Sequence, residues 1–341
     1  MSVIGRIIKI NKKSTLLWHN GKTYTLNLKT KHNIGDIIDE NDNLITKCFI
    51  NYNHDNNLNQ YNYFKKKFEY IKLTRRFFEE RGFLETATNK LKESTIDEAN
   101  IDKIKTPYGY LVTSPEVEIK KLLSIGFDKL FELNFAYRDD FENNLHKKEF
   151  LMLEWYRNFA KPKDIIKDFI DLIKFLHPKS SILHYQDFKI DLNKIEFVSY
   201  NKLFKQYAQI DINNFDDEII SDKFCISGYE NKLELLDAVF ALKIERNLGV
   251  KHPVVVYNFP KQRAALSKIA NGYAKRYEVY IAGIELGNCY DEENDYQKLI
   301  KRFNNKDKEF FKYMAQGIPN TSGIAVGFER LIMLLENLTS L

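Results

Sequence analysis

The sequence has few cysteines and no long apolar segments, and each shortage excludes a class of protein. Its 341 residues include three cysteines, Cys48, Cys225 and Cys289, which are too far apart for a disulfide framework or a CxxC metal pair. No apolar run has the length of a membrane span. The first residues, MSVIGRIIKINKK, lack the apolar core of a signal peptide. We therefore expect a cytoplasmic protein that makes no contact with a membrane.

A strong excess of one charge is also missing. The chain has 52 basic and 47 acidic residues, which gives a net charge of +5. This balance indicates a mixed surface rather than a nucleic-acid-binding arm. Hydrophobic residues make up 44% of the chain, which is enough for a large core in one or two domains.

The N-terminal part predicts a small β-rich module over residues 1–50. Asn20-Gly21 lies there between two strand-like runs, which is a strong hairpin signal. The module either decorates the protein or docks a partner. Residues 51–61 are polar and rich in asparagine, and we expect a linker there.

The rest of the chain, residues 62–341, predicts one larger domain. Residues 62–82 place apolar side chains at helical spacing and end at Gly82, which indicates a long helix that packs into the core or against a second copy. Beyond it, strands and helices follow each other without a regular βα alternation. This pattern favours an α+β fold around an antiparallel sheet.

Two strand-like runs, KLFELNFAYR and FLMLEWY, carry the first candidate site. Alternation along the strands places Arg138, Phe150, Glu154 and Tyr156 toward one cavity. Arginine suits a phosphate, an aromatic ring can stack on a base, and Glu and Tyr on an apolar face are costly unless they bind something. The ordinary alternative is a salt bridge from Arg138 to Glu154 or Glu132.

A second cluster consists of Glu278 and Glu285 on either side of a predicted turn at residues 282–283. Two carboxylates opposed on a hairpin repel each other, and a Mg²⁺ ion shared with a phosphate would remove that repulsion. Asn288 and Glu292 follow, and they suit a cationic substrate group. The alternative is a solvated acidic face.

The third cluster is the stretch GIAVGFERL. Its small residues, Gly323, Ala325 and Gly327, allow close approach to the backbone. Arg330 falls in the first turn of the helix that follows, where the helix dipole disfavours a cation. A bound anion or nucleotide would explain its position, and a surface arginine is the alternative.

Together these stretches resemble the signature motifs of the class II aminoacyl-tRNA synthetases of the lysyl type. Residues 62–82 resemble motif 1, YRDD…HKKEF…LEWY resembles motif 2 and GIAVGFERL resembles motif 3. TSPE and EVYIAGIELGN resemble the lysine-specific subgroup. The resemblance covers residues 62–341. It implies a synthetase-like antiparallel sheet flanked by helices, a homodimer formed through motif 1, and the use of ATP and Mg²⁺.

The short N-terminal part, LEWYR and Ala325 resemble the branch of the family that modifies a protein. That branch activates lysine or (R)-β-lysine and attaches it to a lysine side chain of elongation factor P. Two other functions stay open. One is a minimal lysyl-tRNA synthetase that charges tRNA, against which the short module and Ala325 argue. The other is a non-catalytic binding protein, against which the intact motifs argue.

The resemblance also implies a role for each matched residue. ATP would be bound by Arg138, Asp139, Asp140, His146, Lys147, Phe150, Glu285, Leu286, Gly327 and Arg330. The amino-acid pocket would be formed by Ser114, Pro115, Glu116, Glu154, Tyr156, Asn288, Glu292 and Ala325. Mg²⁺ would be held by Glu278 and Glu285, and the catalytic residues would be Arg138, Glu285 and Arg330. Two positions depart from the family pattern: Asp140 replaces a glutamate, and Lys147-Lys148 replaces Asn-Pro.

Overall fold

The computed structural model describes residues 3–94, 96, 101–140, 143, 145–303 and 307–340. The chain forms two compact units, Met1–Lys72 and Leu73–Leu341. The boundary between them falls inside helix α1, His54–Glu79. Among the described residues, none of the helices is both long and apolar enough to span a bilayer.

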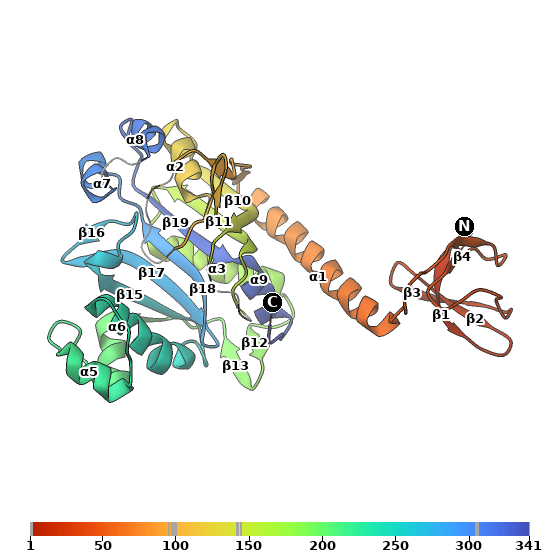
Figure 1. The fold of residues 1–341 in the computed structure, drawn as a ribbon. Helices are drawn as coiled ribbons and strands as arrows, with labels where there is room; N and C mark the ends of the chain where they lie inside the picture. Colours follow the sequence, from red (N-terminus) through yellow and green to blue (C-terminus); the bar gives the residue numbers. More distant parts are fainter. Residues whose placement is uncertain are drawn as a thin grey trace. The chain divides into compact units, whose positions relative to one another are not determined.

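The N-terminal unit contains a five-stranded antiparallel sheet in the order β3-β2-β1-β4-β5 (Figure 1). Its strands are β1 Gly5–Ile10, β2 Thr15–His19, β3 Lys22–Leu26, β4 Ile37–Ile38 and β5 Leu44–Thr46. Ile7, Leu17 and Ile38 are fully buried at its core. The predicted β-rich module is thereby confirmed, and Asn20-Gly21 connects β2 to β3 with both residues at positive φ.

Helix α1 begins at His54, so the expected linker is helical from that residue onward. Asparagine is a weak helix former, and contacts with the sheet of the same unit outweigh its preference. The Trp18 ring lies 5.8 Å from the His54 ring and 5.1 Å from the Tyr61 ring, between centroids. Tyr61 Oη also donates a hydrogen bond to Asn20 Oδ1 at 3.0 Å. These contacts link two parts of the sequence that the linear pattern left unrelated.

The second unit is built on a nine-stranded sheet whose main path runs β14-β15-β17-β18-β19-β11-β10-β6, with β16 beside β17. Its pairs are antiparallel except for β14 with β15 and β6 with β10. The strands are β6 Leu84–Glu85, β10 Lys129–Tyr137, β11 Glu149–Asn158, β14 Glu196–Ser199, β15 Val254–Pro260, β16 Ile269–Ala270, β17 Tyr273–Ile281, β18 Ile284–Asp291 and β19 Thr321–Gly327.

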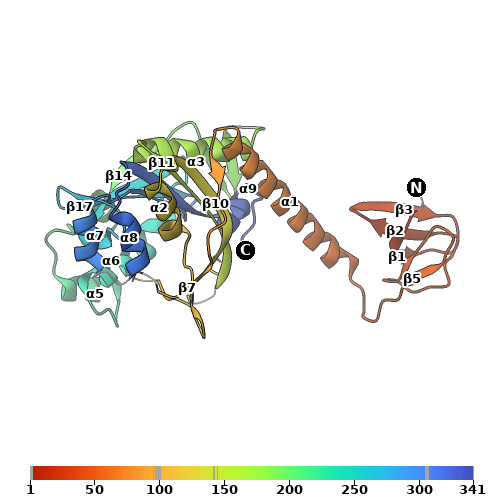
Figure 2. The ribbon, with the colours of Figure 1, turned by 90° about the horizontal axis from the view of Figure 1, so that it is seen from above.

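Helices surround this sheet, and α2, α7 and α8 lie side by side in both ribbon views (Figures 1 and 2). The helices are α2 Glu116–Ser124, α3 Pro162–Leu176, α4 Tyr200–Leu203, α5 Asp217–Phe224, α6 Lys232–Val239, α7 Tyr296–Phe303, α8 Lys308–Met314 and α9 Phe328–Leu335. Two small sheets complete the unit, formed by β7 Leu91–Lys92, β8 Lys105–Thr106 and β9 Gly109–Leu111, and by β12 Ile182–Tyr185 and β13 Phe188–Asp191.

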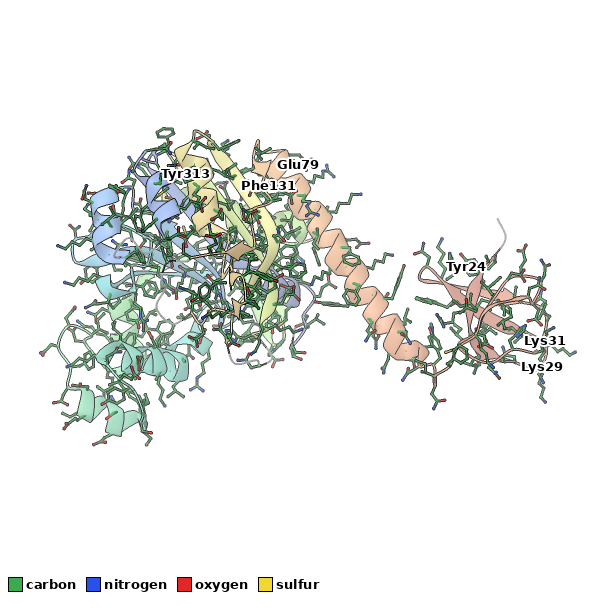
Figure 3. All side chains as sticks on the ribbon, turned by 45° about the horizontal axis from the view of Figure 1, so that its top comes forward. Tyr24, Lys29, Lys31, Glu79, Phe131 and Tyr313 are labelled. Atoms are coloured by element: carbon green, nitrogen blue, oxygen red, sulfur yellow. The ribbon has the colours of Figure 1, made fainter. Side chains whose placement is uncertain are left out.

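One face of the large sheet forms the apolar core. The Phe78 ring near the end of α1 stacks on Phe131 of β10 at 4.7 Å between centroids, and Figure 3 labels Phe131. Trp155 of β11 is fully buried and contacts both Phe78 and Phe169 of α3. Because side chains alternate along a strand, the neighbouring positions of β10 and β11 face the other side, where the candidate site lies.

Candidate active site

Polar and small residues lie in two adjacent rows across the second face of the sheet. The strand register aligns the first row as Glu154, Ala325, Asn288 and Glu278. It aligns the second row as Tyr156, Gly323, Tyr290 and Arg276. All eight residues line one cavity of about 630 Å³. The cavity is therefore built on strands of a rigid sheet, and its chemistry is fixed by the register.

Most of the residues singled out in the sequence line this cavity. They are Ser114, Glu116, Arg138, Asp140, His146, Lys147, Phe150, Glu154, Tyr156, Glu278, Glu285, Leu286, Asn288, Glu292, Ala325, Gly327 and Arg330. Pro115 is outside the lining and precedes the first residue of α2, where Ser114 Oγ accepts a hydrogen bond from Glu116 N at 3.2 Å. Asp139 is also outside it, because its carboxylate pairs with Lys148 at 2.5 Å on an exposed part of the loop.

At one end of the cavity, Arg138 stacks on an aromatic ring. Its guanidinium carbon lies 5.3 Å from the centroid of Phe150, and its Nε donates to the Thr113 carbonyl at 3.4 Å. Glu132, considered above as a salt-bridge partner for Arg138, instead binds Lys90 and accepts a hydrogen bond from Thr86 Oγ1 at 2.9 Å. The strand alternation thus gives an arginine and a ring on the cavity face, as the sequence predicts.

Arg330 in the first turn of α9 is the second cation at this end. Its Nε donates to the Leu145 carbonyl at 3.2 Å, and one of its terminal nitrogens donates to the Glu285 carbonyl at 3.1 Å. Partial burial and the positive charge of Arg330 lower the pKa of His146, so this imidazole is neutral at pH 7. This end therefore presents two guanidinium groups and a neutral imidazole, which is a suitable environment for phosphate groups.

The carboxylates Glu278 and Glu285 are not directly opposed across the hairpin. The register pairs Glu278 with Asn288 and Glu285 with Tyr280, and Leu286 is an extra residue on β18. A bulge of this kind reverses the alternation of side chains along the strand. Glu285 consequently lines the same cavity as Glu278 and Asn288, although its odd position in an unbulged strand would place it on the other face.

The carboxylates of Glu278 and Glu285 are suited to a magnesium ion. Burial and the charge of Glu278 raise the pKa of Glu285 to about 7. Glu278 itself pairs with Arg276 at 2.5 Å and accepts a hydrogen bond from Tyr280 Oη at 2.6 Å. Within the described parts of the chain, no cluster of three or more His, Cys, Asp or Glu residues could hold a metal. Mg²⁺ is commonly bound by one or two carboxylates plus substrate phosphates, and Glu278 with Glu285 meets that requirement.

Further along β11 from Phe150, at the end of the cavity where Tyr156 lies, there is a buried ion-pair network around Lys120. The Lys120 ammonium lies 2.7 Å from Glu116 Oε1, one turn away on α2, and 2.6 Å from Glu292 Oε2. Lys120 is only 1% exposed. The motifs in the sequence did not indicate this lysine. The i, i+4 spacing of Glu116 and Lys120 is visible in the sequence, but nothing there connects either residue to Glu292.

Further buried polar groups surround this network. Glu154 is fully buried and accepts a hydrogen bond from Tyr156 Oη at 2.8 Å. Burial and the nearby charges of Glu154, Glu116 and Glu292 raise the pKa of Tyr156 well above its ordinary value. Burial raises the pKa of Glu292 to about 8, although Lys120 opposes that rise. A group of buried carboxylates of this kind is suited to ammonium groups of a ligand.

Two residues of the second row also differ from the expectation. Gly323 was expected to admit a ligand to the backbone, but a Cβ there would lie 2.2 Å from the Tyr156 ring, so the glycine makes room for that tyrosine. Arg276 was missed by the sequence analysis, and its guanidinium lies 5.3 Å from the Phe259 ring centroid. Its position two residues before Glu278 on β17 was the signal that could have found it.

Comparisons with known proteins agree with this geometry. The family model described as tRNA synthetases class II (D, K and N) matches residues 46–341. The chain is 32% identical over 295 residues to an elongation factor P--(R)-beta-lysine ligase of Haemophilus ducreyi, an alignment that covers 77% of this chain and 86% of that protein. It is 32% identical over 307 residues to the ligase of the same name from Buchnera aphidicola subsp. Acyrthosiphon pisum, with 81% and 92% covered. The chain therefore belongs to the family of class II tRNA synthetases (D, K and N).

Proposed function

We propose that this protein is an ATP-dependent ligase that activates lysine or (R)-β-lysine and transfers it to a lysine side chain of elongation factor P. The observation that carries the proposal is a single cavity with two unlike ends. One end holds Arg138 on the Phe150 ring, and the other holds the buried carboxylates Glu116, Glu154 and Glu292. The names of the relatives supply the identity of the acceptor protein.

The first step forms an aminoacyl-adenylate. A carboxylate oxygen of the amino acid attacks the α-phosphorus of ATP, a new O–P bond forms, and the bond to pyrophosphate breaks. The attacking carboxylate is already ionised at neutral pH, so no general base is required. Arg138 and Arg330 would neutralise charge on the phosphates, and Phe150 would stack on adenine. Catalysis would then consist of positioning and electrostatic stabilisation.

Glu278 and Glu285 would hold Mg²⁺ with the phosphates of ATP. When bound, the ion would offset the negative charge of those phosphates. Arg276 and Tyr280 contact Glu278 and would orient its carboxylate toward the cavity. The bulge at Leu286 would direct the carboxylate of Glu285 toward the same cavity.

The second step transfers the amino acid to the acceptor. The neutral ε-amine of an elongation factor P lysine attacks the carbonyl carbon of the adenylate, a C–N bond forms, and the C–O bond to AMP breaks. The proton lost from the amine passes to solvent. During this step Glu116, Glu154 and Glu292 would keep the ammonium groups of the substrate in place. Ala325 lies in register between Glu154 and Asn288, and its methyl group would favour a β-amino acid over an α-amino acid.

Two further properties belong to this proposal. Phe64 and Phe68 of α1 are 47% and 62% exposed, and their rings stack at 6.0 Å between centroids. An exposed pair of aromatic rings at i, i+4 supports a homodimer in which α1 contacts a second copy.

We also place the protein in the cytoplasm, where translation factors act. Its three free cysteines suit that reducing compartment.

Intact-mass measurement of the acceptor tests the proposal. The protein is given ATP, Mg²⁺ and lysine or (R)-β-lysine, with elongation factor P in one reaction and total tRNA in another. We expect a mass gain of one lysyl group on elongation factor P, and we expect the Arg138→Ala variant to lose it. A label on tRNA alone would contradict the proposal and indicate a minimal lysyl-tRNA synthetase. Pyrophosphate release without a label on either would mean that the acceptor is a different molecule.

A further inference from the structure

Lys120 lies next to the amino-acid end of the cavity and links two segments that line it. Its ammonium contacts Glu116, on the same helix α2, and Glu292, which follows β18. Both carboxylates line the cavity, whereas Lys120 is not among the described lining residues. Its side chain is 1% exposed, so this positive charge is a fixed part of the protein rather than a group that exchanges with solvent.

We propose that Lys120 is a positioning residue that sets the charge of the amino-acid pocket. Its ammonium holds Glu116 and Glu292 in fixed positions and favours their ionised forms. With Glu154, the pocket has three carboxyl groups and one internal ammonium, so ionisation of all three when the substrate binds would leave two negative charges for the two ammonium groups of a diamino acid. The inference rests on the proposed function, because it specifies how that site would recognise its substrate.

The electrostatics of Glu292 explain why an internal cation is needed there. Buried carboxylates that face one another become protonated unless a cation is near them. The charged and titratable groups around Glu292 are Lys120 and Glu116 from α2, Tyr156 from β11, and Cys289 and Asp291 from β18, the strand that Glu292 follows. Lys120 is the one cation in this described set, and it lowers the pKa of Glu292 against the effects of burial and Glu116.

Lys120 itself keeps its charge in this environment. Burial lowers the pKa of Lys120, but Glu116 and Glu292 raise it by more, so the pKa lies above its ordinary value. The ammonium is therefore present throughout the neutral pH range. A neutral side chain of the same length would leave the two carboxylates facing each other without compensation, and protonation of Glu292 would follow at higher pH than in the native protein.

The neighbouring Lys121 provides a matched control. It lies on the same helix, its side chain is 6% exposed, and its ammonium contacts two carboxylates, Glu118 at 2.9 Å and Glu309 at 2.6 Å. The ammonium also lies 5.8 Å from the centroid of the Tyr313 ring, which Figure 3 labels. Neither Glu118 nor Glu309 is among the described residues that line the cavity. Loss of this ion pair should affect stability without affecting recognition of the substrate.

The experiment compares Lys120→Met with Lys121→Met by amino-acid-dependent ATP–pyrophosphate exchange across a range of pH. For Lys120→Met we expect the KM for lysine or (R)-β-lysine at pH 7 to rise about tenfold or more, with kcat changed by about threefold at most. We also expect the acid limb of kcat/KM to move upward by about one pH unit or more. For Lys121→Met we expect KM and the pH profile of the native protein.

A second variant keeps the proposal testable if the methionine variant does not fold. Lys120→Ala removes atoms that correspond to propylammonium, and it is purified and assayed with and without that amine. We expect propylammonium to restore exchange and the native pH profile, and we expect neutral propanol to have no effect. Restoration by both compounds, or by neither in a folded protein, would overturn the proposal.

Failure of this inference is distinct from failure of the proposed function. A native protein that exchanges with lysine or (R)-β-lysine, together with equal KM and pH profiles in the two methionine variants, would overturn the role of Lys120 alone. A native protein that shows no exchange, and no calorimetric binding of either amino acid, would overturn both.

Discussion

The two ends of the cavity differ in the partners of three cations, Arg138, Arg330 and Lys120. At the end assigned to the nucleotide, Arg138 and Arg330 donate to backbone carbonyls of Thr113, Leu145 and Glu285. At the end assigned to the amino acid, charged side chains contact one another: Lys120 binds Glu116 and Glu292.

This difference indicates that Arg138 and Arg330 are available to neutralise the charge of a ligand. Lys120, in contrast, is already neutralised by carboxylates of the protein. Carbonyl oxygens are neutral partners, and a phosphate can replace them with a gain of charge-assisted hydrogen bonds. A buried ion pair is costly to break, because each partner would remain as an uncompensated charge. Substitutions at the nucleotide end should therefore reduce the rate, and substitutions at the amino-acid end should change affinity, pH dependence or stability.

The largest effect is expected for Arg138→Ala, at the nucleotide end. Loss of its guanidinium removes a cation placed for the charge that develops on the phosphates, and ATP–pyrophosphate exchange should fall about 100-fold to 1,000-fold. The control is Arg157→Ala on the same hairpin, because Arg157 pairs with Asp168 at 2.8 Å and is not among the described lining residues. Equal losses in both variants would mean that Arg138 supports the fold rather than the reaction.

The second prediction concerns stability at the amino-acid end. The pKa of Glu292 is raised to about 8, above the value near 4.5 of an unfolded carboxyl group. Between those values the folded state binds more protons, so the stabilising effect is fully present at low pH and is lost as pH rises through about 8. Chemical unfolding should show a decrease in the free energy of unfolding from pH 5 to pH 9 that is smaller in Glu292→Gln by about 2 kcal/mol or more.

The free energy of unfolding is compared between the native protein and Glu292→Gln at each pH. Identical slopes of the free energy of unfolding against pH would contradict the raised pKa of Glu292. The variant has an amide that does not titrate in this range, so a difference in slope reports on Glu292 and on its interaction with Lys120 and Glu116.

Two tyrosines allow the two ends to be compared directly, because the hydroxyl of each donates a hydrogen bond to the glutamate two residues before it. Tyr156 donates to Glu154 at 2.8 Å, and Tyr280 donates to Glu278 at 2.6 Å. Tyr156→Phe should raise the KM for the amino acid about tenfold and leave the KM for ATP unchanged. Tyr280→Phe should change the dependence on ATP and Mg²⁺ by a similar factor. Steady-state exchange kinetics measure both, and the opposite assignment would reverse the two ends of the cavity.

The smallest effect is expected for Ala325→Gly. Ala325 lies between Glu154 and Asn288 in the strand register, and loss of one methyl group should shift the preference from (R)-β-lysine toward lysine by about tenfold or less. The ratio of kcat/KM for the two amino acids measures this shift. An unchanged ratio in a variant that melts near the native temperature would show that this methyl group does not contribute to selectivity.

Local patterns predicted the strands of this site well. The register between strands and the contacts between distant segments were harder to predict. Alternation along β10 and β11 was enough to place Arg138 and Glu154 on one face. The bulge at Leu286 leaves no comparable signal. The expectation that Glu278 and Glu285 oppose each other was wrong, because Glu278 pairs with Asn288 and Glu285 with Tyr280. Lys120 was missed because its partner Glu292 comes from a distant segment, and only the fold brings the two together.

The start of α1 illustrates the same limit. Asparagine-rich residues after position 50 read as a linker from local propensity, yet Trp18 contacts His54 and Tyr61 there. Tertiary contacts of this kind outweigh weak helix preferences, and a single sequence gives no sign of them.

The central claim is that the buried end of the cavity selects an amino acid with two ammonium groups. ATP–pyrophosphate exchange with lysine, (R)-β-lysine and norleucine tests it most directly, because norleucine has the carbon chain of lysine without the terminal amine. The account predicts exchange with at least one of the two diamino acids and none above background with norleucine. Exchange with norleucine at a rate equal to that with the diamino acids, or with none of the three, would contradict it.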